Sequence, residues 1–156
     1  QAVAAVNPTL IMAFVKSTKN VLSTMVGLEA RLGKPHIKDR PQPTYDVSGI
    51  IGFSGGVTGT VVVSFCETAA INMVEAFSGT RLPLEDPDFA DAIGELCNMI
   101  AGNAKKDFGL EASISVPSVV IGSNHQISRM RDVPCIVIPC SSDLGDFTVE
   151  VNIKQL

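Results

Sequence analysis

The stretch GIIGFSGGVTGTVVVSF, residues Gly49 to Phe65, contains two alternating runs of residues with a glycine-rich break between them. The alternation begins near Tyr45, stops at Ser54-Gly55-Gly56 and then resumes. Two runs with a period of two residues, separated by a short glycine turn, are typical of a β-hairpin. We therefore predict a hairpin with one side formed by every second residue, namely Val47, Gly49, Ile51, Phe53, Val57, Gly59, Val61, Val63 and Phe65.

Helical signals lie on both sides of this hairpin. Asn7 followed by Pro8 is typical of a helix N-cap and first position, and apolar residues then recur at helical spacing. Asp86 and Pro87 repeat this start, with acidic residues following and lysines near the end, as the helix dipole favours. The predicted helices are about Pro8–Arg31, Thr68–Phe77 with Ile71, Val74 and Phe77 buried, and Asp86 to a stop at Gly109; the proline-rich segment Lys34–Pro43 is a connector.

The rest of the chain carries signals of further strands, which complete a prediction of the fold. These segments are Ser113–Val116, Val119–Ile121, Cys135–Pro139 and a final run in which Phe147, Val149, Val151 and Ile153 alternate with Thr148, Glu150, Asn152 and Lys154. The final run is typical of a strand with one solvent-facing side. The order of elements predicts an α+β fold, a largely antiparallel sheet with helices packed on one face. A helix followed by a hairpin occurs twice, in Pro8–Phe65 and Asp86–Lys154, so we expect a pseudo-repeat within a single domain of residues 1–156.

Composition excludes several classes of function. The formal net charge of −4, from 12 basic and 16 acidic residues, disfavours nucleic-acid binding, which needs clustered lysine and arginine. No uncharged apolar run approaches the ~18 residues needed to cross a bilayer, so we expect no membrane span, and the start of the chain predicts no signal peptide. The 4 cysteines match no zinc or redox spacing, and we interpret them as reduced thiols of a cytoplasmic protein.

The third predicted helix has two distinct faces. With about 100° of rotation per residue, Phe89, Ile93, Leu96 and Ile100 share a narrow arc that must face the core. The opposite side is a row of outward residues, and Gly94 and Gly102 lie one turn before and after its asparagine. Bare backbone at both positions is expected to leave the amide clear, although glycines also permit close packing of another helix. The outward row consists of Asp91, Glu95, Asn98, Gly102 and Lys105.

The spacing Asp91-x-x-x-Glu95-x-x-Asn98, continuing through MIAGNAK, resembles the signature of the CheC/CheX/FliY family of bacterial chemotaxis phosphatases. The resemblance extends to the opening helix, the hairpin, the helix after it and the stretch SISVPSVVIGSNHQI, so it covers nearly the whole chain. A second Glu-x-x-Asn is absent from the sequence, which makes the chain most similar to the CheX branch.

This resemblance implies a phosphatase that dephosphorylates a phosphorylated CheY-like response regulator in two-component signalling. It implies that Glu95 docks the regulator and that Asn98 enters the regulator's active site to orient the attacking water. We expect Asp91, Gly94, Gly102 and Lys105 to contact the partner. No cofactor or metal of the protein's own is implied, since the Mg²⁺ belongs to the regulator. CheX relatives form dimers in which the sheets of two subunits meet, so a homodimer is expected.

Two rival functions remain open at this point. The first is a non-catalytic binding module for a response regulator or a flagellar switch component; the presence of both Glu95 and Asn98 favours the enzyme over it. The second is a small-molecule hydrolase, which would need a deep polar pocket that nothing in the sequence indicates. His36 and His125 lie far apart and are interpreted as surface residues, and the glycines of GFSGGVTG as a hairpin turn, not a phosphate-binding loop.

Overall fold

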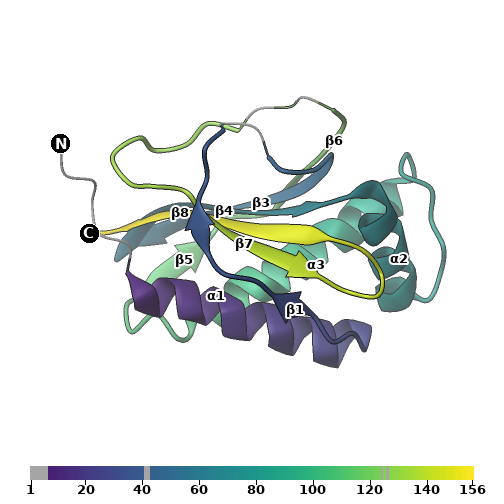
Figure 1. Cartoon of the computed structure of the whole chain (residues 1–156), viewed down its shortest axis with the longest axis horizontal. Helices are drawn as coiled ribbons and strands as arrows, with labels where there is room; N and C mark the ends of the chain where they lie inside the picture. Colours follow the sequence, from purple (N-terminus) through teal and green to yellow (C-terminus); the bar gives the residue numbers. More distant parts are fainter. Residues whose placement is uncertain (1–6, 41–42, 124, 126) are drawn as a thin grey trace.

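The computed structural model describes residues 7–40, 43–123, 125 and 127–156, which form a sheet with helices against it (Figure 1). The helices are α1 (Pro8–Val21), which continues as the π-helix η1 (Leu22–Val26), α2 (Glu67–Ser78) and α3 (Pro87–Lys105). The strands are β1 (Arg31–Leu32), β2 (His36–Ile37), β3 (Val47–Gly55), β4 (Val57–Phe65), β5 (Ala112–Ile114), β6 (Ser118–Ile121), β7 (Ile136–Ser141) and β8 (Phe147–Gln155). None of these helices is long and apolar enough to cross a membrane.

The strands pair in the order β1-β7-β8-β4-β3-β5, with β2 also on β7 and β6 also on β3, and every pair among the described residues is antiparallel. The predicted hairpin is β3–β4, in which Val47 lies opposite Phe65. A second hairpin, β7–β8, comes later in the chain than α3, just as β3–β4 comes later than α1, and the two hairpins meet where β4 pairs with β8. The predicted α+β fold is therefore confirmed.

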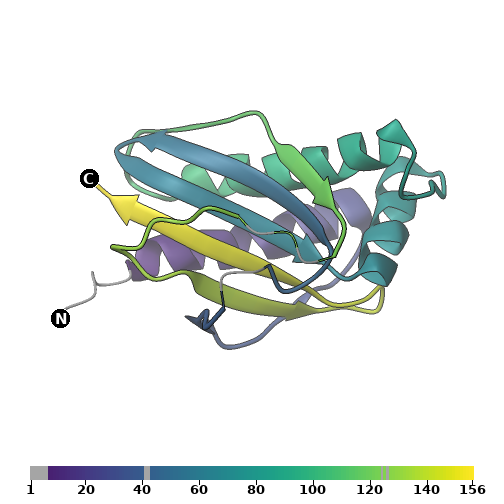
Figure 2. The same ribbon diagram turned by 90° about the horizontal axis from the view of Figure 1, so that it is seen from above.

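Helices α1 and α3 lie side by side against one face of the sheet, as predicted, with α2 near one end (Figures 1 and 2). Phe14 of α1 is fully buried in the core. Helix α3 comes very close to β3 because Gly49 has no side chain: a Cβ there would lie 2.2 Å from Cys97 Sγ. On the α1 side, Ser17 Oγ donates a hydrogen bond of 2.6 Å to the Ile100 carbonyl. These contacts fix α3 relative to both β3 and α1.

The three helices differ from the prediction in some details. Helix α3 ends at Lys105, one turn before the expected stop at Gly109. The first helical segment ends at Val26 and not near Arg31, because Gly27 adopts a left-handed φ of 72°, which is a common way to end a helix. Leu28 and Ala30, which follow, are buried, so the chain turns back toward the core there. Helix α2 has the expected bounds to within a residue, but its fully buried face consists of Ala69, Ala70, Met73 and Val74, while Ile71 and Phe77 are half-buried.

The prediction that one side of β8 faces solvent was wrong. Thr148, Glu150 and Asn152 are 4%, 0% and 1% exposed, respectively. The described residues of the segment after β2 and of the long connection between β6 and β7 cross this face of the sheet (Figure 2). The Asn152 side chain contacts that connection directly, since its Oδ1 accepts a hydrogen bond of 2.9 Å from Met130 N.

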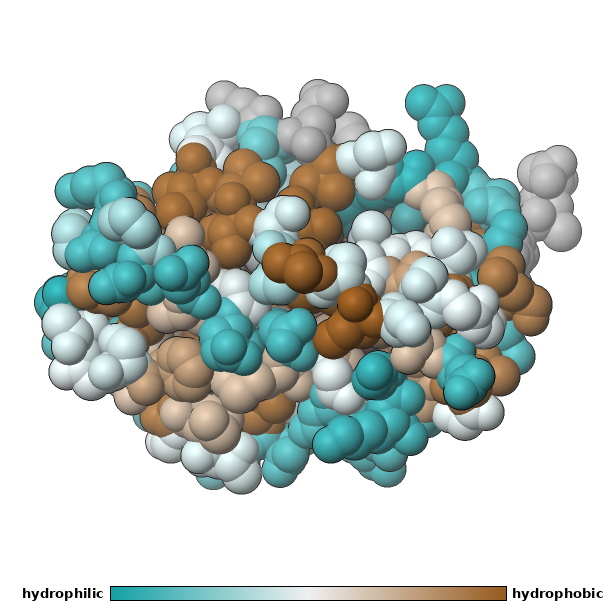
Figure 3. Space-filling model, turned by 180° about the vertical axis from the view of Figure 1, so that it is seen from behind, coloured by the Kyte–Doolittle hydropathy of each residue, from teal (hydrophilic) through white to brown (hydrophobic). Residues whose placement is uncertain are grey.

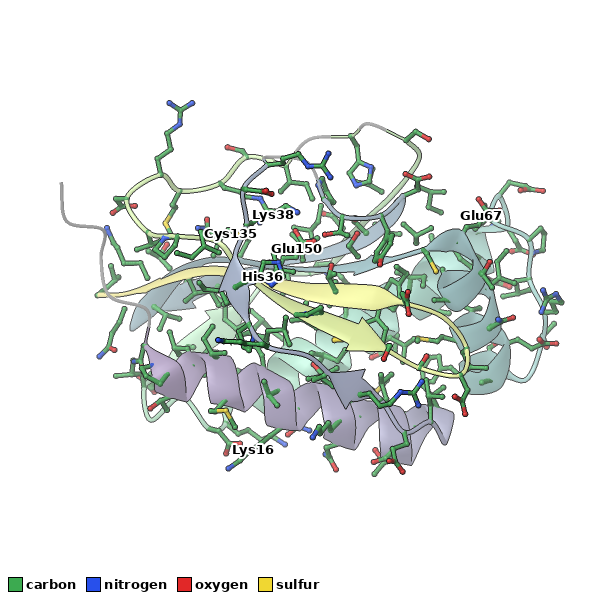
Figure 4. The ribbon with its side chains drawn as sticks, viewed as in Figure 1. Lys16, His36, Lys38, Glu67, Cys135 and Glu150 are labelled. Atoms are coloured by element: carbon green, nitrogen blue, oxygen red, sulfur yellow. The ribbon has the colours of Figure 1, made fainter. Side chains whose placement is uncertain are left out.

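Glu150 keeps its charge in this buried place because cationic and hydroxyl groups surround it. Its Oε1 accepts a 2.9 Å bond from Arg129 Nη2 and lies 3.5 Å from Lys38 Nζ, and its Oε2 accepts 2.8 Å bonds from the Thr44 and Thr148 hydroxyls. Burial acts to raise the pKa of Glu150, but the two hydroxyl bonds and the two cations outweigh it and hold that pKa below its usual value. Figure 4 shows Lys38 and Glu150 on the side of the sheet away from α1.

Candidate active site

The candidate residues lie on α3, and its start is fixed by local signals that the sequence displays. Asp86 is the N-cap, and its side chain accepts a 2.9 Å hydrogen bond from the backbone N of Asp88. Pro87 occupies the first helical position, where its missing N–H costs nothing. The predicted core face, Phe89, Ile93, Leu96 and Ile100, is buried. With the start and the core face fixed, the rotation of every other side chain of α3 follows.

The opposite side of α3 carries the predicted outward residues. Asp91 and Glu95 are exposed, and Asn98, Gly102 and Lys105 are half-buried. Among the hydrogen bonds and ion pairs found within the described residues, none involves the side chain of Glu95 or Asn98. Both polar groups are thus available to a molecule that approaches from outside.

Asp91, Glu95 and Asn98 form one wall of an open groove of about 810 Å³. The groove runs between α3 and the segment that joins β5 to β6. Its opposite wall is mostly apolar, so the groove presents carboxylates and an amide on one side and hydrocarbon on the other. The face that holds α3 and the β5–β6 edge is seen in Figure 3, where brown apolar and teal hydrophilic surface lie next to each other. The lining residues of the apolar wall are Ile114, Ser115, Val116, Pro117 and Val119.

Gly94 does not leave empty space beside Asn98, so the expectation that bare backbone at this position clears the amide was wrong. It is buried, and a Cβ at this position would lie 3.3 Å from Pro117 Cγ and 3.6 Å from Val119 Cγ2. The glycine allows the apolar wall to pack directly on α3. Close packing was the alternative explanation, but the segment that packs here is not the helix that was expected. On the other side of Asn98, a Cβ at Gly102 would meet only Ile114 Cδ1 at 3.9 Å, so this position is more open.

The site has few chemical groups of its own. Within the described parts of the chain, no group of three or more His, Cys, Asp or Glu side chains gathers in a way that could hold a metal ion. The predicted contact residues Asp91 and Gly94 line the groove, whereas Gly102 and Lys105 do not. What the groove offers is positioning by one amide and two carboxylates.

Other residues singled out in the sequence lie outside the groove. His36 is exposed on β2, and His125 contacts the Gly122 carbonyl at 2.7 Å and Ser48 Oγ at 3.0 Å. The glycine turn of GFSGGVTG connects β3 to β4, as predicted for a hairpin. All 4 cysteine thiols are free, and burial raises the pKa of Cys97 and Cys140 to about 12. Cys97 and Cys140 are therefore not reactive thiolates at neutral pH.

The apolar wall was missed by the sequence analysis. For its three central residues, Ser115 to Pro117, the sequence predicts only the end of an extended piece followed by a proline. The available signal was that proline between two strand-like segments, because proline inside a sheet is largely confined to edges and bulges. The local sequence does not tell which helix such a bulge will face.

Comparison with known proteins gives one consistent answer. Residues 47–141 match the family model described as "Chemotaxis phosphatase CheX". A curated relative, the CheY-P phosphatase CheX of Thermotoga maritima, is 27% identical over 150 residues, which cover 94% of this chain and 96% of the relative.

Solved structures agree with this match. The crystal structure of a chemotaxis protein CheX from Desulfovibrio desulfuricans is 36% identical, with a TM-score of 0.83 over 94% of this chain and 99% of that one. A more distant fold match, 22% identical with a TM-score of 0.74, covers 94% of this chain and 98% of the chain from the CheX-CheY-BeF₃-Mg²⁺ complex of Borrelia burgdorferi.

Proposed function

Since the chain belongs to the CheX family of chemotaxis phosphatases, we propose that it dephosphorylates a phosphorylated CheY-like response regulator and so ends the regulator's signal. In this proposal Asn98 orients the attacking water and Glu95 docks the regulator. The curated Thermotoga relative is named as a CheY-P phosphatase, and the Borrelia relative was crystallised with CheY, BeF₃ and Mg²⁺. Both names support a regulator of the CheY type as the partner.

The observation that carries the proposal is the pairing of Glu95 and Asn98 in an open groove. The two residues lie one turn apart on α3, both line the groove, and no hydrogen bond among the described residues occupies either side chain. Because α3 is held against β3 and α1, the two groups are presented on a rigid support. Little conformational entropy is then lost when a partner engages them.

The chemistry needs no more than this set of groups. Hydrolysis of an acyl phosphate transfers the phosphoryl group to water: the new P–O bond forms to the water oxygen, and the bond to the regulator's carboxylate breaks. The transition state is loose, so positioning and electrostatics supply most of the catalysis. A neutral amide such as that of Asn98 can accept a hydrogen bond from the water and donate another to a phosphoryl oxygen. The carboxylate of Glu95 can pair with a cation of the regulator.

We assign the Mg²⁺ to the regulator and not to this chain. Mg²⁺ prefers several oxygen ligands in near-octahedral geometry, and the described residues offer no cluster of carboxylates or histidines for it. When bound in the regulator, the metal would neutralise charge on the phosphoryl oxygens. This chain's own residues bind the regulator and orient water.

The test is phosphate release from a CheY-like regulator of the same genome, phosphorylated in the presence of Mg²⁺. We expect Asn98→Ala to lower kcat by about 100-fold, as is typical when one transition-state hydrogen-bonding group is removed, with binding retained. Asn103→Ala is the matched control, because this asparagine lies on the same helix outside the groove. Phosphate release from the regulator that is not accelerated by the wild-type protein would overturn the proposal and favour the non-catalytic binding module.

Glu95 is tested by binding. Its charge is expected to strengthen docking, so Glu95→Gln should raise KM by about 10-fold. Glu111→Gln, which removes an exposed carboxylate outside the groove, should leave KM unchanged. If both variants behave alike, Glu95 has no special part in docking.

We also propose that the protein is a cytoplasmic homodimer whose sheets meet. The outer positions of the described sheet are held by short strands, β1 and β2 on one side and β5 and β6 on the other, which can accept further pairing. The free cysteines are compatible with a reducing compartment. Light scattering of the purified protein should give twice the chain mass of 16.5 kDa, whereas a single-chain mass would exclude the dimer.

A further inference from the structure

The centre of the apolar wall is a β-bulge at the edge of the sheet. Phe53 pairs with Ile114 and Ile50 pairs with Ser118. Between these pairs, two residues of β3 face three residues of the edge, Ser115, Val116 and Pro117. We call these three residues the 115–117 bulge. A bulge bends its strand and redirects a side chain, and bulges are over-represented next to active sites.

The 115–117 bulge is held on two sides. Ser115 forms two hydrogen bonds with Gly52, its Oγ accepting from Gly52 N at 2.8 Å and its N donating to Gly52 O at 2.9 Å. Ser115 Oγ also donates to the Val116 carbonyl at 3.1 Å. Pro117 packs against Gly94 of α3, and its ring restricts the backbone further. The bulge therefore keeps one shape before any partner arrives.

The 115–117 bulge holds the Val116 side chain in solvent. Val116 is 85% exposed, the most exposed of the large apolar side chains described. A single exposed valine is ordinary on a protein surface. This one, however, lies on a braced bulge and lines the same groove as Glu95 and Asn98. This position beside Glu95 and Asn98, and not its exposure alone, points to a role in binding.

On the basis of the proposed function, we infer that Val116 is a docking and specificity-determining residue for the response regulator. The partner surface that fits the groove carries a cation opposite Glu95 and an apolar side chain opposite Val116 and Pro117. Glu95 and Asp91 supply the negative wall for the cation, and the bulge supplies the apolar wall. A regulator with a polar or charged group at the second position would leave that group desolvated against hydrocarbon, and it would bind more weakly.

The test measures binding and turnover separately. Removing most of the apolar area with Val116→Ser should raise KM, and the Kd for a CheY-like regulator loaded with beryllofluoride and Mg²⁺, by about 10-fold, with kcat unchanged. Val116→Ile keeps the apolar character of the side chain and should bind the loaded regulator as the wild type does. Ile37→Ser is the matched control, since Ile37 is 64% exposed on β2 at the opposite edge of the sheet; it should leave both constants unchanged.

The outcomes separate this inference from the proposed function. Unchanged KM and Kd in Val116→Ser overturn the docking role, while phosphate release by the wild type would still support the phosphatase. A wild type that binds the loaded regulator but releases no phosphate refutes the phosphatase, and the Kd values still decide the role of Val116. A fall in kcat alone, or a change of Val116→Ser from dimer to monomer in light scattering, also overturns docking, because the side chain would then serve catalysis or contact between copies.

Discussion

Gly94 and Gly102 provide a matched pair of substitutions, because both lie inside α3 and differ in their surroundings. Replacing glycine by alanine in a helix interior is worth about 1 kcal/mol in propensity. At Gly102 the new Cβ would make one ordinary contact, at 3.9 Å from Ile114 Cδ1. At Gly94 it would lie 3.3 Å from Pro117 Cγ, so either the helix or the 115–117 bulge must shift by a few tenths of an ångström.

Helix propensity and packing together set the sign of each change in stability. Gly102→Ala keeps the propensity gain, so we expect the free energy of unfolding to rise by about 1 kcal/mol, which corresponds to a Tm increase of about 2–4 °C in a domain of this size. At Gly94 the gain is opposed by overpacking, which costs about 1–3 kcal/mol. We expect Gly94→Ala to be between neutral and about 2 kcal/mol less stable than the wild type.

The assay is urea unfolding of both variants and the wild type, followed by circular dichroism, with thermal melts as a second measurement. Because both variants change the unfolded chain in the same way, the difference between them reports on the folded state. An increase in stability of the same size in both variants would refute the close packing of Pro117 on α3. It would also remove the support for a rigid apolar wall.

Three further predictions concern parts of the fold that carry the site. Glu150→Gln leaves the buried cations Lys38 and Arg129 without a counter-charge and should cost about 3 kcal/mol of stability. Because folding lowers the pKa of Glu150, the stabilisation by its charge is complete above the ordinary pKa of 4.5 and is lost as pH falls through the lower folded pKa. Urea midpoints measured from pH 7 to pH 3 will show this loss in the wild type, and the same pH profile in the variant would contradict it. Gly59→Ala, at a φ of 139° and with a Cβ 2.0 Å from the Asn152 carbonyl oxygen, should lose about 3 kcal/mol or more, and a normal soluble yield and urea midpoint would argue against this. Asp86→Ala removes the N-cap of α3 and should lower Tm by the equivalent of about 1 kcal/mol, whereas Asp86→Asn should not.

Local signals were enough to predict the hairpin and the rotation of α3. In the hairpin, a period of two on both sides of Gly55-Gly56 defines strands and turn together. In α3, Asp86 and Pro87 define the start, and the core residues then define which side faces outward. Glu95 and Asn98 were found in this way, together with the family resemblance that gave them roles. These features depend on neighbours within a few residues, which a sequence displays directly.

What could not be predicted depends on contacts between distant segments. The alternation in β8 reports only polarity and therefore predicts a side that faces water. Glu150 is nevertheless buried, together with Lys38 and Arg129, which come from two other parts of the chain. Leu28 fits the helical spacing and so predicts that the first helix continues past Gly27, yet in the structure Leu28 is buried after the chain has turned. In both cases the residue pattern was compatible with two environments, and tertiary packing decided between them.

The width of the groove follows from a single strand. Helix α3 is placed by Gly49 of β3, which lets Cys97 approach, and the 115–117 bulge is placed by Gly52 of the same strand through Ser115. Both walls of the groove are thus positioned by glycines three residues apart on β3. Strand β3 is paired with β4 on the side away from the bulge. A reaction that relies on positioning tolerates only small errors, since a displacement of about 1 Å can cost on the order of 100-fold in rate. Building both walls on one interior strand keeps Asn98 and the 115–117 bulge in register. In the proposed reaction, this support supplies the precision while the reacting groups belong to the regulator.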